Sequence, residues 1–151
     1  MNGSSFRFRL ERVRALRERS EDAAKQALAE AMQEHHLASQ ELDRAHERVA
    51  RACAAQLEAT AGKSTVHDLL ARQAYLERAE RAVHATRHDL ERHERHLEQR
   101  RQELHVAARD RQALERLKEN RRADHEREAA RRESIVLDEI AINGFRRRRA
   151  A

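Results

Sequence analysis

Residues 69–104, LLARQAYLERAERAVHATRHDLERHERHLEQRRQEL, decide the fold, because an apolar residue recurs in them at every seventh position. The repeat consists of Leu69, Leu76, Val83, Leu90, Leu97 and Leu104. The chain has no proline that would interrupt a helix. A seven-residue apolar repeat forms a stripe along one side of an α-helix, and this stripe is stable only when another helix covers it. The pattern therefore predicts a coiled coil.

A second repeat, made of small residues, lies earlier in the chain and supplies the partner. It consists of Ala24, Ala31, Ala38, Ala45, Ala52 and Ala59, with Leu28, His35, Leu42, Val49 and Gln56 set between them. Between the two repeats, TAGKSTVHD (residues 60–68) predicts a helix stop at Gly62 and a restart at Thr65, with Asp68 as the capping-box partner of Thr65. A turn there folds the chain back on itself.

The turn predicts which residues meet. With a turn at residues 62–65, residues whose numbers sum to about 128 face each other across an antiparallel pair. The facing pairs are Ala31 with Leu97, Ala38 with Leu90, Ala45 with Val83 and Ala52 with Leu76, and Leu10 and Val13 come beside Leu114 and Leu117. A turn a few residues earlier would keep small residues opposite large ones in a register shifted by one heptad, so two registers remain open.

The predicted fold class is all-α: a long antiparallel two-helix coiled-coil hairpin with an overhanging C-terminal helix. We expect a single coiled-coil domain over residues 1–151, with helix 1 at about 6–61, the turn at about 62–65, helix 2 at about 66–143 and a basic tail at 146–151. Helix 1 is then about 85 Å long and helix 2 about 115 Å. Disorder is the alternative, but the unbroken heptads and the abundance of strong helix formers favour helix over residues 10–118.

The overhang divides into a polar and an apolar part. Residues 118–134 contain no large apolar side chain and suit a solvated helix supported by pairs such as Glu128 with Arg132. Apolar residues then return beyond any partner helix, at Ile135, Val136, Leu137, Ile140, Ile142 and Phe145, followed by four arginines at 146–149. An exposed apolar patch next to a basic cluster indicates a binding surface. The alternative is a frayed tail that folds back or self-associates.

Features that resemble catalytic or ligand sites do not form complete motifs. AGKST at residues 61–65 resembles the end of a phosphate-binding loop, but Leu57 stands where the motif needs glycine, and a helix precedes it instead of a strand. His84 with His88, and His93 with His96, have metal-ligand spacing, yet ten histidines on long helices produce such spacings by chance. We expect no enzyme activity, no cofactor, no metal and no small-molecule substrate.

Composition indicates a soluble, intracellular protein, and its positive charge could suit nucleic acid, anionic lipid or an acidic protein surface. Cys53 is the only cysteine, and the chain shows neither a signal-peptide pattern nor a stretch of ~20 apolar residues. The net charge is +5, but arginine and glutamate alternate along nearly the whole chain and only the tail is purely basic. This placement does not favour a specific nucleic acid as the partner.

Three segments carry a resemblance to a known family. They are FRFRLERVRALRE at residues 6–18, LERLKE at 114–119 followed by LDEIA at 137–141 and Phe145, and Tyr75-Leu76 with Ala79 and Val83. Taken in their order along the chain, these segments resemble the flagellar FliJ family, small coiled-coil proteins of the bacterial flagellar type III export apparatus. The resemblance covers nearly the full chain.

The resemblance implies a non-enzymatic stalk that inserts into the hexameric flagellar export ATPase and promotes its assembly and activity. The ATPase-facing residues would be Leu10, Val13, Leu137, Asp138, Glu139, Ile140 and Phe145. It also implies contacts with export chaperones and with the cytoplasmic domain of the export gate protein. The gate-facing residues would be Tyr75, Leu76, Ala79, Ala82, Val83 and Thr86. The location would be cytoplasmic, peripheral to the inner face of the cell membrane.

The heptad places Leu76, Ala79, Val83 and Thr86 in the seam between the helices, so contact with a gate protein would need the hairpin end to splay. Three other readings remain open. A stalk of a virulence injectisome would share the hairpin and the kind of partner. A basic nucleic-acid-binding coiled coil would lose affinity for DNA steeply as salt rises. A parallel homodimeric scaffold would pair two copies of the chain.

Overall fold

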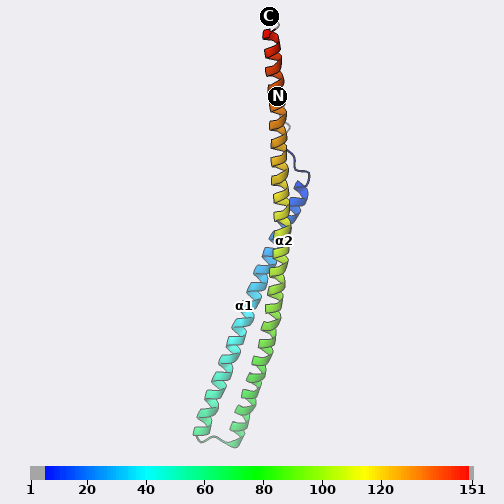
Figure 1. Ribbon diagram of the computed structural model, residues 1–151. Coiled ribbons are helices and arrows are strands. Elements are labelled where there is room, and N and C mark those ends of the chain that lie inside the picture. Colours follow the sequence, from blue (N-terminus) through cyan, green and yellow to red (C-terminus); the bar gives the residue numbers. More distant parts are fainter. Residues whose placement is uncertain (1–5, 150–151) are drawn as a thin grey trace. The chain divides into compact units, whose positions relative to one another are not determined.

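The computed structural model describes residues 6–149 and contains two long helices, α1 (Glu11–Ala61) and α2 (Val66–Arg149), with no strand among those residues (Figure 1). The helices are joined by a short turn and pack against each other, which confirms the predicted all-α helical hairpin. The chain divides into two compact units. One is Asp22–Val106, which includes the turn, and the other takes the described residues up to Glu21 and from Ala107 onward.

The core of the unit Asp22–Val106 is a seam of small side chains. Its buried apolar residues are Ala31, Ala45, Ala52 and Ala59 from α1 and Ala79 and Leu97 from α2. Four of these belong to the alanine repeat, and Leu97 belongs to the leucine repeat. Alanine lets two helices approach closely, so each layer of the seam buries little apolar surface but leaves little empty space between the helices. The two heptad repeats are therefore the two sides of one interface, as predicted.

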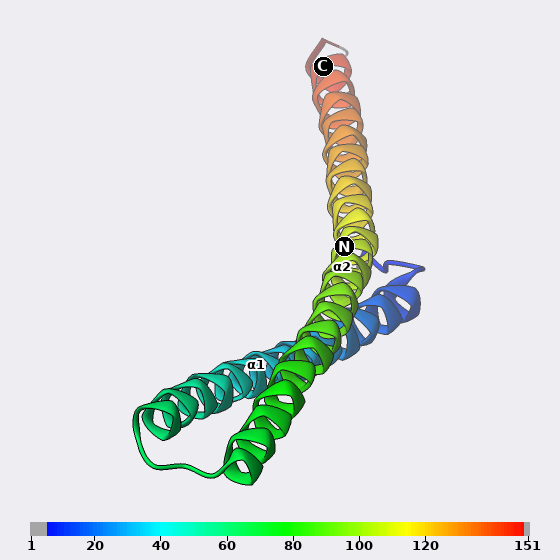
Figure 2. The ribbon, with the colours of Figure 1, turned by 90° about the horizontal axis from the view of Figure 1, so that it is seen from below.

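A short turn joins α1 to α2 (Figure 2), and the predicted capping box forms where α2 restarts. The Asp68 carboxylate accepts hydrogen bonds from the Thr65 backbone N–H at 3.2 Å and from the Thr65 hydroxyl at 2.6 Å. The Thr65 hydroxyl oxygen in turn accepts a hydrogen bond from the Asp68 N–H at 3.2 Å. Helix α1 ends directly before Gly62, but Gly62 does not have the positive φ of a glycine C-cap. The turn is therefore fixed more by the capping box at Thr65 than by the backbone conformation of Gly62.

Cross-helix contacts decide between the two registers. In this unit Glu34 lies 3.6 Å from His93 and 3.7 Å from His96, and His35 lies 3.8 Å from Glu94. The Arg72 guanidinium donates to the Ala55 carbonyl at 3.4 Å. These residue numbers sum to about 128, and a one-heptad shift would lower each sum by about seven. The register with the turn at residues 62–65 is the one that forms.

In the other unit, charged pairs join the two helices. Arg14 pairs with Glu115 at 2.7 Å, and Arg17 pairs with Asp110 at 3.1 Å. Two further pairs are Lys118 with Glu11, at 3.0 Å, and Arg111 with Glu21. Glu21, 6% exposed, is the buried charged residue among residues 6–149, whereas no apolar residue of this unit is buried in that range. This part of the hairpin is held by charge where the other unit is held by alanine packing.

The helix ends differ from the prediction in two places. Helix α1 begins at Glu11 and not near residue 6, because the preceding segment stays non-helical and the Phe6 ring packs on His125, 5.8 Å between centroids. Helix α2 continues past Gly144 to Arg149 and does not end near residue 143. The arginines of its last turn interact favourably with the negative end of the helix dipole, which offsets the cost of glycine. Residues 150 and 151 of the predicted tail lie outside the described residues.

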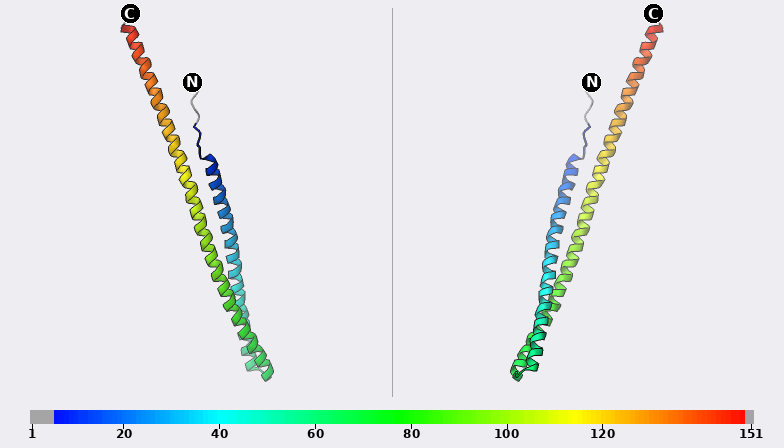
Figure 3. Two further views of the ribbon diagram at one scale, coloured as in Figure 1. Left: turned by 90° about the vertical axis from the view of Figure 1, so that its right-hand side faces the viewer. Right: turned by 90° about the vertical axis from the view of Figure 1, so that its left-hand side faces the viewer.

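The predicted overhang is present within the unit that contains the chain ends. Helix α2 continues well beyond the start of α1 (Figure 3). Residues 119–134 are exposed except for the half-buried His125, and Arg132 pairs with Glu128 at 3.1 Å as expected. The polar stretch is therefore a solvated helix apart from the contact with Phe6.

Candidate interaction site

The last four turns of α2 form an exposed apolar tip. It comprises Ile135, Val136, Leu137, Ile140, Ile142 and Phe145, which are between 44% and 66% exposed. Asp138 and Glu139 lie among them and are exposed as well. Side chains of this size are normally buried, and no other described segment covers them, so a partner is the natural occupant.

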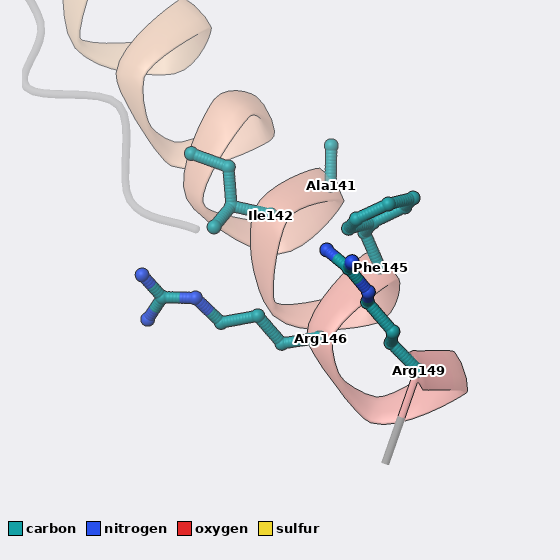
Figure 4. Close-up of a pocket in the computed structure, with 5 residues that line it drawn as sticks. All are labelled: Ala141, Ile142, Phe145, Arg146 and Arg149. Atoms are coloured by element: carbon teal, nitrogen blue, oxygen red, sulfur yellow. The ribbon is translucent and has the colours of Figure 1, made fainter. Parts of the chain in front are cut away.

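The end of the tip combines apolar and basic groups. Ala141, Ile142, Phe145, Arg146 and Arg149 line a shallow surface pocket. In Figure 4 the Arg149 side chain runs beside the Phe145 ring, and Arg146 extends on the side of the helix that carries Ile142. Helix geometry explains this grouping, because residues three and four apart share a face. The surface offers aromatic and aliphatic contact area next to guanidinium groups, a combination frequent at the centres of protein interfaces.

The two halves of the predicted ATPase-facing set lie apart. Leu10 and Val13 are 39% and 41% exposed at the beginning of α1. Leu10 lines a groove with Leu117, as the register predicts. Leu117 precedes Leu137 by 20 positions on one continuous helix, which is about 30 Å. The structure therefore forms two separate exposed surfaces, and a partner would have to span both.

The groove at the start of α1 was not predicted from the sequence. It is lined by Phe6, Arg7, Phe8, Arg9, Leu10, Leu117, Arg121, Asp124, His125 and Glu128. The signal that could have found it is the pairing rule itself, because Phe6 and His125 fit the same antiparallel register. The apolar pattern does not mark this groove, because residues 118–134 carry no large apolar side chain.

The predicted gate-facing strip lies largely in the seam. Ala79 is buried at 8% exposure, and Leu76, Ala82, Val83 and Thr86 are half-buried. The Thr86 hydroxyl donates to the carbonyl oxygens of Ala82 and Val83 at 3.0 and 3.1 Å, so its polar group is occupied within α2. Tyr75, 51% exposed, is the member that presents most of its side chain. The strip therefore consists of one exposed aromatic residue, Tyr75, and five residues that are buried or half-buried in the seam.

Charged groups at the start of α1 influence each other strongly. Arg14 donates to Glu11 at 2.9 Å and to Glu115 at 2.7 Å, and Lys118 donates to Glu11 at 3.0 Å. The hydrogen bonds from Arg14 and then Lys118 lower the pKa of Glu11, and those to Glu11 and Glu115 raise the pKa of Arg14. Similarly, the hydrogen bond to Glu21 raises the pKa of Arg111. These ion pairs join α1 to α2 in the observed register.

The histidine pairs do not build a metal site in the described part of the chain. His93 and His96 both face Glu34 across the seam, while His88 lies 3.9 Å from Glu91 on its own helix. No group of three or more potential ligands there has the geometry to hold a metal ion. Cys53 is exposed. Neither described helix has an apolar stretch sufficient to cross a membrane.

The fold and the exposed tip together define a class: a helical-hairpin protein whose prominent surface is suited to binding. The family model described as the flagellar FliJ protein matches residues 6–150, and the chain belongs to the FliJ family. The chain is thus a component of the flagellar export apparatus, in a family that is structural or chaperone-like and not enzymatic. No curated protein and no solved structure matches the chain.

Proposed function

We propose that this protein is the stalk of the flagellar export ATPase: its tip inserts into the hexameric ring and promotes ring assembly and ATP hydrolysis. Membership of the FliJ family supports the location. The observation that carries the proposal is the exposed apolar tip of α2, which extends past the start of α1. Such a tip buries apolar area only when a partner encloses it, and burial of that area supplies the binding free energy.

The stalk would act by differential binding and not by bond chemistry. A ligand shifts a conformational equilibrium only when it binds the two states unequally. A helix end that presents different side chains to each side meets each ring subunit differently, so it favours some nucleotide states over others. Contact with several subunits at once would also stabilise the assembled hexamer, because the stalk binds the assembled ring and not its parts.

We further propose contacts with the cytoplasmic domain of the export gate protein and with export chaperones, at a cytoplasmic site peripheral to the inner face of the cell membrane. Tyr75 would be the first gate contact, since its side chain is exposed one helical turn before the buried Ala79. The half-buried members could join only if α1 moved away from this part of α2. Seam layers built on alanine bury little area, which keeps the cost of that movement small.

The test is stimulation of the purified export ATPase by the full chain and by a chain truncated after Ser134. Full-length protein should bind and stimulate, and the truncated chain should do neither, while both keep the helicity of the hairpin. A matched control changes exposed apolar residues elsewhere: Leu57→Ser with Leu70→Ser should leave stimulation intact, whereas Leu137→Ser with Ile140→Ser should reduce it. Equal stimulation by the full and truncated chains would contradict the tip as the binding element.

An injectisome stalk is the second candidate, because the same hairpin and tip would serve there. The identity of the ATPase that the protein binds distinguishes a flagellar stalk from an injectisome stalk. Binding to a flagellar export ATPase and absence of binding to an injectisome ATPase supports the flagellar assignment that the family indicates.

A further inference from the structure

The tip of α2 is apolar on all sides and not on one face. Consecutive residues of an α-helix lie about 100° apart around the axis. Ile135, Val136 and Leu137 are consecutive, helical and exposed, so they point in three widely separated directions, and Phe145 adds a fourth. A helix that binds a flat surface concentrates its apolar residues on one side. This distribution fits a partner that surrounds the helix.

The basic end has the same circular arrangement. Arg146, Arg147, Arg148 and Arg149 are helical and exposed, and their positions divide the circumference of the helix almost evenly. We call these four residues the arginine collar. It stands directly beyond the apolar tip, so a partner that encloses the tip also encloses the collar.

The collar differs from the arginines that precede it on α2. Arg122, Arg127 and Arg132 each pair with a carboxylate of their own helix, at 2.9, 2.9 and 3.1 Å. Among residues 6–149 no carboxylate pairs with the collar, and the nearest acidic residue before it is Glu139, seven positions from Arg146. Within the described residues the collar therefore offers guanidinium groups that are open to carboxylates of a partner. Arginine suits this role because its planar group binds carboxylates in a bidentate way.

We propose that the end of α2 is received by an acidic protein socket: a cavity with an apolar wall around residues 135–145 and carboxylates on several sides at the depth of the collar. This proposal rests on the proposed function and identifies the chemistry by which the ATPase ring recognises the stalk. An anionic membrane is the competing ligand for a basic helix, but membrane-surface helices separate the apolar and basic faces, and both groups here encircle the axis.

The experiment compares two variants with the same change in net charge. In the collar variant, Arg146, Arg147, Arg148 and Arg149 are replaced by Gln; in the control, Arg122, Arg127, Arg131 and Arg132 are replaced by Gln. Affinity for the purified export ATPase is measured at low and high salt, with circular dichroism to show that both chains stay helical. We expect the collar variant to bind at least about tenfold more weakly at low salt and to lose most of the salt dependence, because exposed charge attraction is screened by salt. The control should behave like the wild type.

The outcomes separate the two proposals. If the wild type binds and the collar variant binds equally well with the same salt dependence, the stalk function stands and the acidic socket is wrong. If the wild type does not bind the ATPase at all, the proposed function fails and the socket fails with it. If the wild type instead sediments with phosphatidylglycerol vesicles, and the collar variant loses this binding without losing affinity for the ATPase, the collar serves a membrane and the socket is overturned.

Discussion

At the scale of single residues, alanine packing sets the strength of the hairpin. Ala45 is 0% exposed and faces Val83 in the observed register, so its methyl group leaves no space for a larger side chain. Added methylenes in a closely packed core force side chains or backbone to move, at a cost of about 1–3 kcal/mol. We expect Ala45→Leu to lower the free energy of unfolding by that amount, measured by urea denaturation followed by circular dichroism.

The matched control is Ala29→Leu, because Ala29 is exposed on the same helix and the two residue types have similar helix propensity. It should leave the midpoint of denaturation nearly unchanged. Equal effects of the two substitutions would mean that helix propensity, and not the seam, determines stability at Ala45.

The capping box at the start of α2 should make stability depend on pH. The hydrogen bonds from the Thr65 hydroxyl and then from its backbone N–H lower the pKa of Asp68. A carboxylate whose pKa is lower in the folded state contributes stability above its unfolded pKa, and this contribution is lost as pH falls through the folded pKa. Below about pH 4 the wild type should therefore lose the stability that the Asp68 carboxylate contributes. Asp68→Asn should be less stable than the wild type at neutral pH, and its stability should not show this decrease on acidification.

The readout is the midpoint of thermal unfolding at neutral and at acidic pH for the two chains. Thr65→Ala removes the other half of the box and should cost about 1 kcal/mol at neutral pH. A wild-type midpoint that rises on acidification relative to Asp68→Asn would contradict the sign of the argument.

At the scale of the elements, the two helices are joined by different forces in the two units. The unit near the turn buries six apolar residues, while the unit with the chain ends relies on pairs such as Arg14 with Glu115 and Lys118 with Glu11. Salt weakens exposed ion pairs, since the Debye length falls to about 3 Å at 1 M, but it does not weaken apolar burial. The start of α1 should therefore open in high salt while the alanine seam remains closed.

Hydrogen exchange of backbone amides measures this directly. Amides near Arg14 should exchange several-fold faster in about 1 M sodium chloride than in dilute buffer, and amides near Ala52 should be unaffected or slower. Glu115→Gln should speed exchange near Arg14 already at low salt. Uniform acceleration along α1 would show that the two regions open together.

At the scale of the whole molecule, the two helices of one chain pair with each other. Ala31 and Leu97 are both buried and belong to facing repeats. With Cys53 replaced by Ser, cysteines at positions 31 and 97 should form crosslinks within one chain. Cysteines at positions 31 and 90 should not, because one heptad displaces them by about 10 Å along the axis. Crosslinks mainly between chains, seen as dimers on a denaturing gel, would favour a parallel homodimer instead.

Much of the hairpin could be predicted because coiled-coil periodicity is a local signal. The alanine and leucine repeats identify the two inner faces, and Thr65 with Asp68 identifies the helix restart. Other features depend on side chains distant in sequence. The Glu21–Arg111 pair and the contact of Phe6 with His125 are invisible to periodicity, since each requires the register to be known first.

The predicted end of α2 shows the opposite failure, in which a local signal is misleading. Asn143 and Gly144 indicate a helix end, yet the helix continues to Arg149. Glycine in a helix costs roughly 1 kcal/mol, which is small beside the continuing backbone hydrogen bonds and the favourable placement of cations at the helix end.

The sequence by itself determined that the chain forms two helices, that a turn follows Ala61, and which residues face inward, because each depends on side chains within a few turns of one another. Only the tertiary structure decided the register in which the two inner faces meet. Heptad repeats look the same after a shift of seven residues, so the choice rests on specific cross-helix contacts such as Glu34 with His93. The same choice leaves Tyr75 outside, buries Ala79 and leaves the tip of α2 uncovered.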